Sequence, residues 1–364
     1  MKILHIDPDD IDNPYSGGGP VRNYEIYKRL SKRHEITVLT PTFDGSTSEK
    51  VRDGIRYVRL GKKIGDHGSS HHITFFFSLP KAVRSMEYDL LVEDFMPPLS
   101  STINPLFAKA PVIGSVQWFF AESLSKQYKL PFFLGERYGV RLYRNLIVLT
   151  DQMRGLIQER NPNANLKVIP NGVEDALFNA EGKFGDYILY LGRVDVQQKG
   201  VDLLLCSYAK IPESKRLPLC LVGHCFQERE VMSLINSLGL HQWVTVRPRV
   251  SGLDKIKLIS QSRFVCVPSR EETFGMVITE ACACGKAVVL FDKAPMNEVA
   301  SKACIKVEPF DMDAYSKAML DLLNRTEQEM SSISQVCVDW ASKFQWDEIA
   351  LQQEQFYISV VQGN

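Results

Sequence analysis

Short apolar runs alternate with segments of helical periodicity in the first half of the chain. Residues 2–6 (KILHI) and 34–41 (HEITVLTP) are rich in apolar and β-branched side chains, and residues 21–33 between them repeat apolar side chains near helical spacing. This order of strand, helix and strand predicts a βαβ unit, which implies a parallel sheet. Further strand-like runs follow at residues 55–60, 88–94, 110–116 and 145–150.

A second series of strands and helices begins near residue 167. Its strand-like runs are apolar almost throughout, as expected when helices cover both faces of a parallel sheet. Strands are predicted at 186–193, 217–223, 243–248, 263–269 and 286–291, and helices at 200–211, 229–240, 253–262 and 274–285. The chain is therefore expected to be an α/β protein with two doubly wound domains.

The pattern predicts three segments. We expect an N-terminal domain over residues 1–166, a C-terminal domain over 167–344 and a C-terminal helix over 345–364. The Asn- and Pro-rich stretch 160–167 is the candidate linker.

Composition excludes several classes of protein. Lys and Arg number 43, as do Asp and Glu, so the net charge is zero. This argues against a protein that binds nucleic acid over its whole surface. No apolar run reaches the roughly 20 residues that span a bilayer. All eight cysteines lie in the second half, without C-x-x-C spacing, and the chain starts in a predicted strand rather than a signal peptide. We therefore expect a cytoplasmic protein with reduced thiols.

The segment 268–285 (PSREETFGMVITEACACG) carries the most specific chemical signal. A polar loop with Glu272 leads into a predicted helix that begins near Phe274, and Glu280 follows inside that helix. Eight residues of helix span about 12 Å or less, near the length of a diphosphate with a sugar at each end. The free N–H groups of residues 274–277 would bind an anion between the two carboxylates. The same spacing also fits a solvated loop glutamate and a surface helix glutamate.

Two cations lie in the loop after the first strand of the second series. Arg193 and Lys199 follow the strand at 186–193, and in a doubly wound sheet such loops line the ligand crevice. They offer a planar fork and a point charge for a diphosphate leaving group, although two exposed loop cations would look the same. In the first half, the glycine-rich turn at 16–20 opens a helix and can hold a phosphate, but it matches neither G-x-G-x-x-G nor a P-loop.

The order and spacing of these segments resemble the retaining glycosyltransferases of family GT4. The matching strings are VIPNGV from residue 168, YLGRVDVQQKGVDLLL from 190, LVG from 221 and PSREETFGMVITEACACGKAVV from 268. Glu272 and Glu280 match the E-x7-E motif of that family, and residues 272–275 match its E-x-F-G core. The resemblance implies the GT-B fold, in which two Rossmann-like domains face each other across a cleft and a C-terminal helix crosses back to the N-terminal domain.

The resemblance also implies residue roles. Arg193 and Lys199 would hold the diphosphate and act in catalysis. Glu280 would bind the ribose hydroxyls, and Glu272, with the backbone of residues 273–277, would hold the donor sugar and act in catalysis. The implied donor-binding set, with the glycine-rich turn, the hinge-side turn and the base contacts included, is Gly18, Gly19, Asn171, Arg193, Lys199, Gly223, Arg249, Val250, Glu272, Thr273, Phe274, Gly275, Met276, Val277 and Glu280.

Two positions depart from the family's pattern. Pro248 stands where many relatives have a glycine beside the base, so Arg249 or Val250 would border the base instead. Gln117 stands where many relatives carry a histidine, and a glutamine cannot accept a proton at neutral pH.

A carboxylate could replace that histidine in activating the acceptor. Glu93 and Asp94 end the predicted strand at 88–94 and are the candidates. Capping of the strand end is the alternative.

The implied reaction transfers a hexose from a nucleotide sugar to an acceptor hydroxyl with retention, without a metal or another cofactor. UDP-glucose is the favoured donor and GDP-mannose stays open. The acceptor is expected to be a saccharide or a lipid-linked sugar in bacterial polysaccharide or glycolipid assembly. A nucleotide-sugar epimerase on the same fold and a non-catalytic nucleotide-sugar-binding subunit are the alternatives.

Candidate metal motifs have simpler explanations. The D-x-D pairs at 7–9 and 311–313 fit a strand cap and a helix start. His71 and His72 fall in a predicted loop without other ligands at metal spacing, so no metal site is expected.

The aromatic and basic stretch 118–144 could contact the inner face of a membrane that carries a lipid-linked acceptor. Core packing combined with an acceptor-site lid is the alternative. No nucleic-acid partner is expected.

Overall fold

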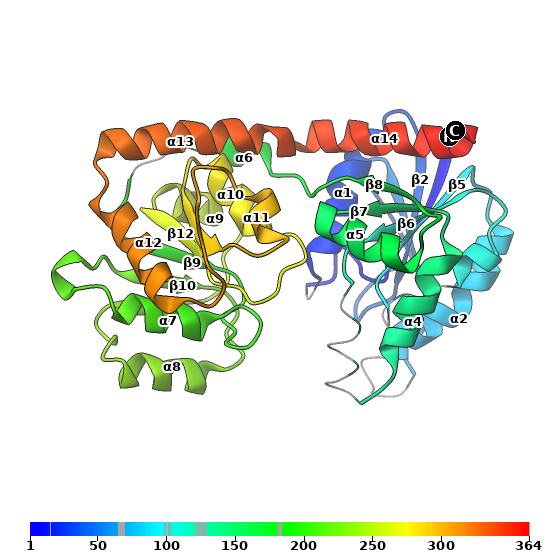
Figure 1. Ribbon diagram of the computed structural model, residues 1–364. Helices are drawn as coiled ribbons and strands as arrows, with labels where there is room; N and C mark the ends of the chain where they lie inside the picture. The colour runs from blue at the N-terminus through cyan, green and yellow to red at the C-terminus, as the bar shows by residue number, and fades with distance from the viewer. Residues whose placement is uncertain are drawn as a thin grey trace. The chain divides into compact units, whose positions relative to one another are not determined.

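The computed structural model describes residues 1–14, 16–64, 70–97, 100, 103–119, 121, 125, 129–180 and 184–363. The chain divides into two units, Met1–Asn171 with Trp346–Asn364 and Gly172–Gln345 (Figure 1). Each unit is built on a parallel or mostly parallel sheet with helices between its strands, so the expected α/β class is confirmed. Among the described residues, no helix combines the length and the apolar composition that crossing a bilayer requires.

The sheet of the first unit has eight strands in the order β3-β4-β2-β1-β5-β6-β7-β8. Neighbouring strands pair in parallel except β3 and β4, which form an antiparallel pair at one edge. The strands are β1 (Lys2–Ile6), β2 (Glu35–Pro41), β3 (Glu49–Arg52), β4 (Ile55–Leu60), β5 (Leu90–Asp94), β6 (Val112–Val116), β7 (Asn145–Val148) and β8 (Asn165–Val168). The helices are α1 (Gly18–Leu30), α2 (Ser70–Ser85), α4 (Phe132–Gly139), α5 (Asp151–Arg160) and α14 (Trp346–Gln362), with short 3-10 turns at Asn104–Leu106 and Val140–Leu142.

Helix α14 completes the core of the first unit. Trp346 is 1% exposed and packs in the same cluster as Ile26 and Tyr27 of α1. Further along α14, the guanidinium of Arg33 donates to both carboxylate oxygens of Glu354, at 2.9 and 2.5 Å. The last helix of the chain is therefore part of the first unit, as the resemblance implied.

The sheet of the second unit has six strands, all parallel, in the order β11-β10-β9-β12-β13-β14. The strands are β9 (Ile188–Leu191), β10 (Leu219–Val222), β11 (Val244–Arg247), β12 (Phe264–Val267), β13 (Val288–Phe291) and β14 (Ile305–Val307). The helices are α6 (Asp175–Phe178), α7 (Val201–Ala209), α8 (Glu228–Ser237), α9 (Gly252–Ser260), α10 (Met276–Ala283), α11 (Met296–Val299), α12 (Met312–Asn324) and α13 (Glu327–Ala341), with 3-10 turns at Glu213–Lys215 and Ser342–Phe344.

Burial explains why the strands of the second unit have apolar sequences. Strands β10, β12 and β13 are buried at every residue, which matches a sheet covered on both faces. Because all the strands run in one direction, their carboxyl ends lie along one edge of the sheet. The loops after β11, β10, β9 and β12 are therefore neighbours at that edge.

Two local expectations differ from the structure. The stretch 160–167 is not a linker, because β8 pairs with β7 and extends the first sheet; the units divide after Asn171 rather than before residue 167. His71 and His72 lie in α2 rather than in a loop, and Nδ1 of His71 lies 2.7 Å from the hydroxyl of Thr42. A four-residue strand and a helix with a polar start are both too weakly patterned to stand out in the sequence.

We predict that Trp346→Ala lowers the free energy of unfolding of the first unit by about 3–5 kcal/mol, because it empties a fully buried position in the core. Leu351→Ala on the same helix is the matched control, since Leu351 is 43% exposed, and it should cost about 0.5 kcal/mol or less. Urea unfolding followed by circular dichroism measures both variants against the parent chain. Equal losses in the two variants would contradict the packing of α14.

Candidate functional site

The predicted donor-binding residues of the second unit lie along the carboxyl edge of its sheet. In the order of the strands, the loops carry Arg249 and Val250 after β11, Gly223 after β10, Arg193 and Lys199 after β9, and residues 272–277 after β12. Since these four strands are neighbours, the fold brings the loops together from segments that are far apart in the sequence. Arg249 is exposed and Val250 is half-buried.

One ion pair joins two of these loops. Nζ of Lys199 lies 2.6 Å from Oε1 of Glu272, and the hydroxyl of Ser269 donates to the same oxygen at 2.9 Å. Only 18% of the Lys199 side chain and 14% of the Glu272 side chain are exposed. Glu272 is therefore not a solvated loop residue. The attraction between the two charges is stronger here than on an open surface, because little water screens it.

Glycines allow the loops after β9, β10 and β12 to touch. Gly200 has φ +65°, and a Cβ at this position would lie 2.1 Å from the carbonyl oxygen of Pro268. A Cβ on Gly223 would lie 1.7 Å from the carbonyl oxygen of Gly192. Only a residue without a Cβ permits backbones to approach this closely. The backbone itself therefore sets the distance between the loops that carry the cations and the acids.

Arg270 ties the loop after β12 to α7. Its guanidinium donates to the two carboxylate oxygens of Asp202, at 2.8 and 2.7 Å, and its backbone N–H donates to the carbonyl of Gln198 at 2.9 Å. The side chain of Gln198 accepts a hydrogen bond from Arg193. Arg193 is exposed, so its guanidinium is accessible to an anion from solvent.

Helix α10 begins at this edge of the sheet. Gly275 precedes it with φ +89°, and its carbonyl accepts a hydrogen bond from the N–H of Ile278 at 2.9 Å. The N–H groups at 276–277 belong to the first turn, where no partner exists within the helix, so they can bind an anion. Phe274 is 1% exposed and packs edge-on against Phe344, with ring centroids 6.0 Å apart. Phe274 therefore anchors the start of the helix by packing.

Glu280, the second glutamate of the motif, pairs with Lys255, a residue for which the sequence predicts no role. Nζ of Lys255 on α9 lies 2.8 Å from Oε1 of Glu280 and 3.9 Å from Oε1 of Glu174. Glu280 is 7% exposed and so is not a surface glutamate; burial raises its pKa, although the charge of Lys255 opposes the shift. No specific sequence signal marks Lys255, because a lysine within a predicted amphipathic helix looks like an ordinary surface charge.

In the first unit, Gly18 and Gly19 are the first residues of α1. The N–H of Gly17 before them donates to a carboxylate oxygen of Asp9 at 3.1 Å. A Cβ on Gly19 would meet no described atom within 4 Å, so the start of the helix is open to an approaching group. Asn171 ends the first of the two segments that form this unit; it is buried, and its Oδ1 has no hydrogen-bond partner among the described residues.

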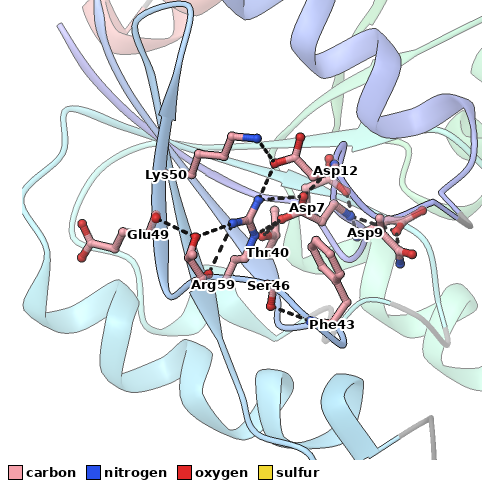
Figure 2. Close-up of polar contacts among 12 residues, drawn as sticks. Asp7, Asp9, Asp12, Thr40, Phe43, Ser46, Glu49, Lys50 and Arg59 are labelled. Atoms are coloured by element: carbon pink, nitrogen blue, oxygen red, sulfur yellow. Dashed lines mark hydrogen bonds and ion pairs between the residues drawn. The ribbon is translucent and has the colours of Figure 1, made fainter.

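Ion pairs centred on the buried Arg59 of β4 fix the loop between β1 and α1, as Figure 2 shows. The guanidinium of Arg59 donates to Asp10 at 2.8 and 3.2 Å and to Asp12 at 2.7 Å. The hydroxyl of Thr40 donates to Asp10 at 2.6 Å, and Lys50 pairs with Asp12 at 2.8 Å. Because only 2% of the Arg59 side chain is exposed, these contacts hold the loop that leads into the glycine-rich turn.

Glu93 and Asp94, the candidates for acceptor activation, are both buried on β5. Glu93 accepts hydrogen bonds from the amide of Asn104 at 2.9 Å and from the hydroxyl of Tyr143 at 2.7 Å. Asp94 accepts from the amide of Asn23 at 2.8 Å. Neighbouring residues of a strand face opposite sides of the sheet, so the two carboxylates lie in separate surroundings.

Asp94 belongs to a buried polar cluster with His5, Asp7 and Asn23. The amide of Asn23 donates to Asp7 and to Asp94, each at 2.8 Å, and Nε2 of His5 lies 3.4 Å from Oδ1 of Asp94. Burial and the charge of Asp94 raise the pKa of Asp7 well above its usual range. Asp7 also accepts the N–H two residues later at 2.9 Å, as a strand cap would. The D-x-D pair at 311–313 starts α12, as expected.

Both halves of the chain match families of glycosyltransferases. Residues 16–177 match the family described as Glycosyltransferase Family 4, and residues 173–335 match the family described as Glycosyl transferases group 1. An MMP alpha-(1->4)-mannosyltransferase of Mycolicibacterium hassiacum is 29% identical over 44% of this chain, and that match spans only 40% of the relative. An uncharacterised glycosyltransferase of Methanocaldococcus jannaschii is 24% identical over 96% of this chain and 97% of its own length.

Solved structures share the fold over the full length of the chain. A sucrose-phosphate synthase from Thermosynechococcus elongatus superimposes with a TM-score of 0.82 at 18% identity, over 100% of both chains. The Anabaena protein HepE, solved in complex with UDP and glucose, superimposes with a TM-score of 0.76 at 18% identity, over 99% of this chain and 100% of its own. These similarities confirm the expected GT-B fold.

We predict that Lys255→Met destabilises the second unit in a pH-dependent way. The substitution leaves the buried carboxylate of Glu280 without its cation, which costs about 3–5 kcal/mol when that carboxylate is charged. Burial already raises the pKa of Glu280, so the folded variant holds a proton more tightly than the unfolded chain, whose glutamate pKa is about 4.3. The loss is therefore small below the unfolded pKa and grows as the pH rises through the folded one.

Urea unfolding at about pH 4, just below the pKa of an unfolded glutamate, and at about pH 8 measures this loss. Lys257→Met is the matched control, because Lys257 is exposed on the same helix. A loss of the same size at both pH values would show that Glu280 does not depend on Lys255.

Proposed function

The chain belongs to glycosyltransferase family 4, and we propose that it transfers glucose from UDP-glucose to an acceptor hydroxyl with retention at the anomeric carbon. The observation that carries the proposal is the Lys199–Glu272 pair beside the start of α10. A cation, a carboxylate and free helix N–H groups at one sheet edge match the parts of a nucleotide sugar, which has a diphosphate between two sets of hydroxyls.

The leaving diphosphate gains negative charge as the sugar departs. Lys199, Arg193 and the first-turn N–H groups of α10 stabilise this charge, and they act without large rearrangement because the contacts at Gly200 and Arg270 already hold the loops in place. In this proposal the protein's own cations do what a metal ion does in other sites, and no further cofactor takes part. The acceptor attacks on the face from which the diphosphate leaves.

The two glutamates hold the two sugars. One carboxylate oxygen of Glu272 accepts hydrogen bonds from Lys199 and Ser269, which orients the carboxylate toward the hydroxyls of the donor sugar. Glu280 binds the ribose hydroxyls, and Lys255 is a positioning residue that keeps Glu280 charged. Arg249 and Val250 border the base from the loop after β11.

Similar proteins support the choice of donor. HepE, which shares the fold, was solved with UDP and glucose. The similarity to a mannosyltransferase keeps GDP-mannose as the second candidate. The acceptor in this proposal is a saccharide or a lipid-linked sugar in polysaccharide or glycolipid assembly.

Asp94 is the better candidate for acceptor activation. Both carboxylate oxygens of Glu93 accept hydrogen bonds from inside the first unit, from Asn104 and Tyr143. Oδ1 of Asp94 accepts no hydrogen bond from the described residues and lies 3.4 Å from Nε2 of His5.

We predict that the chain releases UDP from UDP-glucose, in the presence of mixed saccharide and lipid-linked acceptors, faster than it releases GDP from GDP-mannose. Lys199→Ala and Glu272→Ala should each lower turnover by about 100-fold or more, because each removes a fixed charge beside the reacting atoms. Lys210→Ala is the control, since Lys210 forms an exposed pair with Asp313 away from these loops. Nucleotide release and mass spectrometry of the products measure the outcome.

The products separate the candidate functions. A new glycoside identifies transfer, an epimerised donor identifies an epimerase, and an unchanged donor identifies a nucleotide-sugar-binding subunit. Undiminished turnover in both Lys199→Ala and Glu272→Ala would remove the site assignment.

We also propose that the region around α4 contacts an anionic membrane that carries the acceptor. Phe133 and Leu134 are 37% and 40% exposed, and a hollow of about 540 Å³ beside them is lined by Lys129 and Arg137 as well as Phe133. Apolar and basic side chains on one surface favour the interface of an anionic bilayer. Residues 120, 122–124 and 126–128 of the 118–144 stretch lie outside the described residues.

We predict that replacing Phe133 and Leu134 together by serine reduces cosedimentation with vesicles that contain anionic lipid, because the apolar contact is lost. Leu351→Ser, an equally exposed leucine on α14, is the control. If the parent chain does not bind such vesicles, the membrane proposal is wrong.

A further inference from the structure

Three thiols from separate elements meet in the core of the second unit. Cys282 lies on α10, Cys304 just before β14 and Cys337 on α13. The three sulfurs all lie within 4.8 Å of one another, and those of Cys282 and Cys304 are 3.6 Å apart. The residues are buried, with exposures of 0%, 7% and 0%, and none forms a disulfide.

The fold holds the elements that carry these thiols in place. Helix α13 packs so closely on the end of α10 that a Cβ on Gly285 would lie 2.0 Å from the hydroxyl of Ser334. The indole of Trp340 on α13 donates to the carbonyl of Val299, at the end of α11, at 3.0 Å. These contacts fix the positions of the helices, and so the positions of the backbone at Cys282 and Cys337.

We propose that Cys282, Cys304 and Cys337 form a binding site for a soft monovalent cation, Cu(I), held by three sulfurs. Thiolate sulfur is the ligand type that selects Cu(I). With metal–sulfur bonds of about 2.3 Å, three sulfurs arranged around one ion lie roughly 4 Å apart, which is within the 4.8 Å limit that these three sulfurs already meet.

The number of ligands argues against zinc. A structural zinc ion takes four protein ligands, and a catalytic one takes three with a water. Within the described residues, the group contains three thiols and neither a carboxylate nor an imidazole, and burial keeps bulk water away. When Cu(I) binds, a bond forms to each sulfur as its S–H bond breaks, and the released protons pass to solvent. Neither copper nor sulfur changes oxidation state.

Titration of the intact chain with Cu(I) under anaerobic, reducing conditions tests the site. Bathocuproine disulfonate, which absorbs light when it holds Cu(I), serves as the competitor. The chain should withdraw one Cu(I) per molecule, and Cys304→Ser should weaken the affinity by about 100-fold or more, because loss of a direct ligand should cost at least as much as loss of an outer-shell partner. Cys206→Ser with Cys225→Ser is the matched control, since these half-buried cysteines lie outside the group.

Two further measurements test the proposal even if Cys304→Ser fails to fold. Cys337→Ala removes a different ligand and should show the same loss. X-ray absorption of the Cu(I)-loaded parent chain should show three sulfur neighbours at about 2.3 Å. The assignment would be overturned if a folded variant of the three cysteines took up as much copper as the parent chain, or if the control variant lost its uptake. It would also be overturned by a shell of two sulfurs or of nitrogen and oxygen, or by displacement of Cu(I) by an equal amount of Zn²⁺.

Discussion

The close contact between the backbone at Gly200 and the carbonyl of Pro268 determines where the charges of the second unit meet. Since no side chain separates the two loops, Lys199 from one reaches Glu272 from the other. The same arrangement places both residues beside the first turn of α10, whose N–H groups attract an anion. A larger residue at position 200 would separate the cation from the carboxylate without touching either one.

In the proposed function, one helix determines where the two ends of a nucleotide sugar bind. Glu272 lies just before α10 and Glu280 lies within it, so the length of the helix sets the distance between the two carboxylates. Each carboxylate has its own lysine, from a different element of the same unit. Each lysine offsets part of the cost of burying its carboxylate.

Local sequence patterns predict much of this architecture. The apolar strands of the second unit and the helix after Phe274 were predictable, because burial on both sheet faces and the glycine before α10 each leave a local signal. The partners of Glu280 and of Asp10 were not, because Lys255 and Arg59 look like ordinary surface charges until the fold places them beside an acid. The cluster of three thiols could not be predicted for the same reason, because its cysteines come from elements that no spacing rule connects.

A crystal structure of the chain with UDP-glucose bound would locate the donor relative to these residues. We expect a diphosphate within hydrogen-bond distance of Lys199 and the first-turn N–H groups of α10, with the ribose hydroxyls on Glu280 and the glucose hydroxyls on Glu272. A nucleotide bound elsewhere, with both glutamates still in contact with their lysines alone, would contradict it.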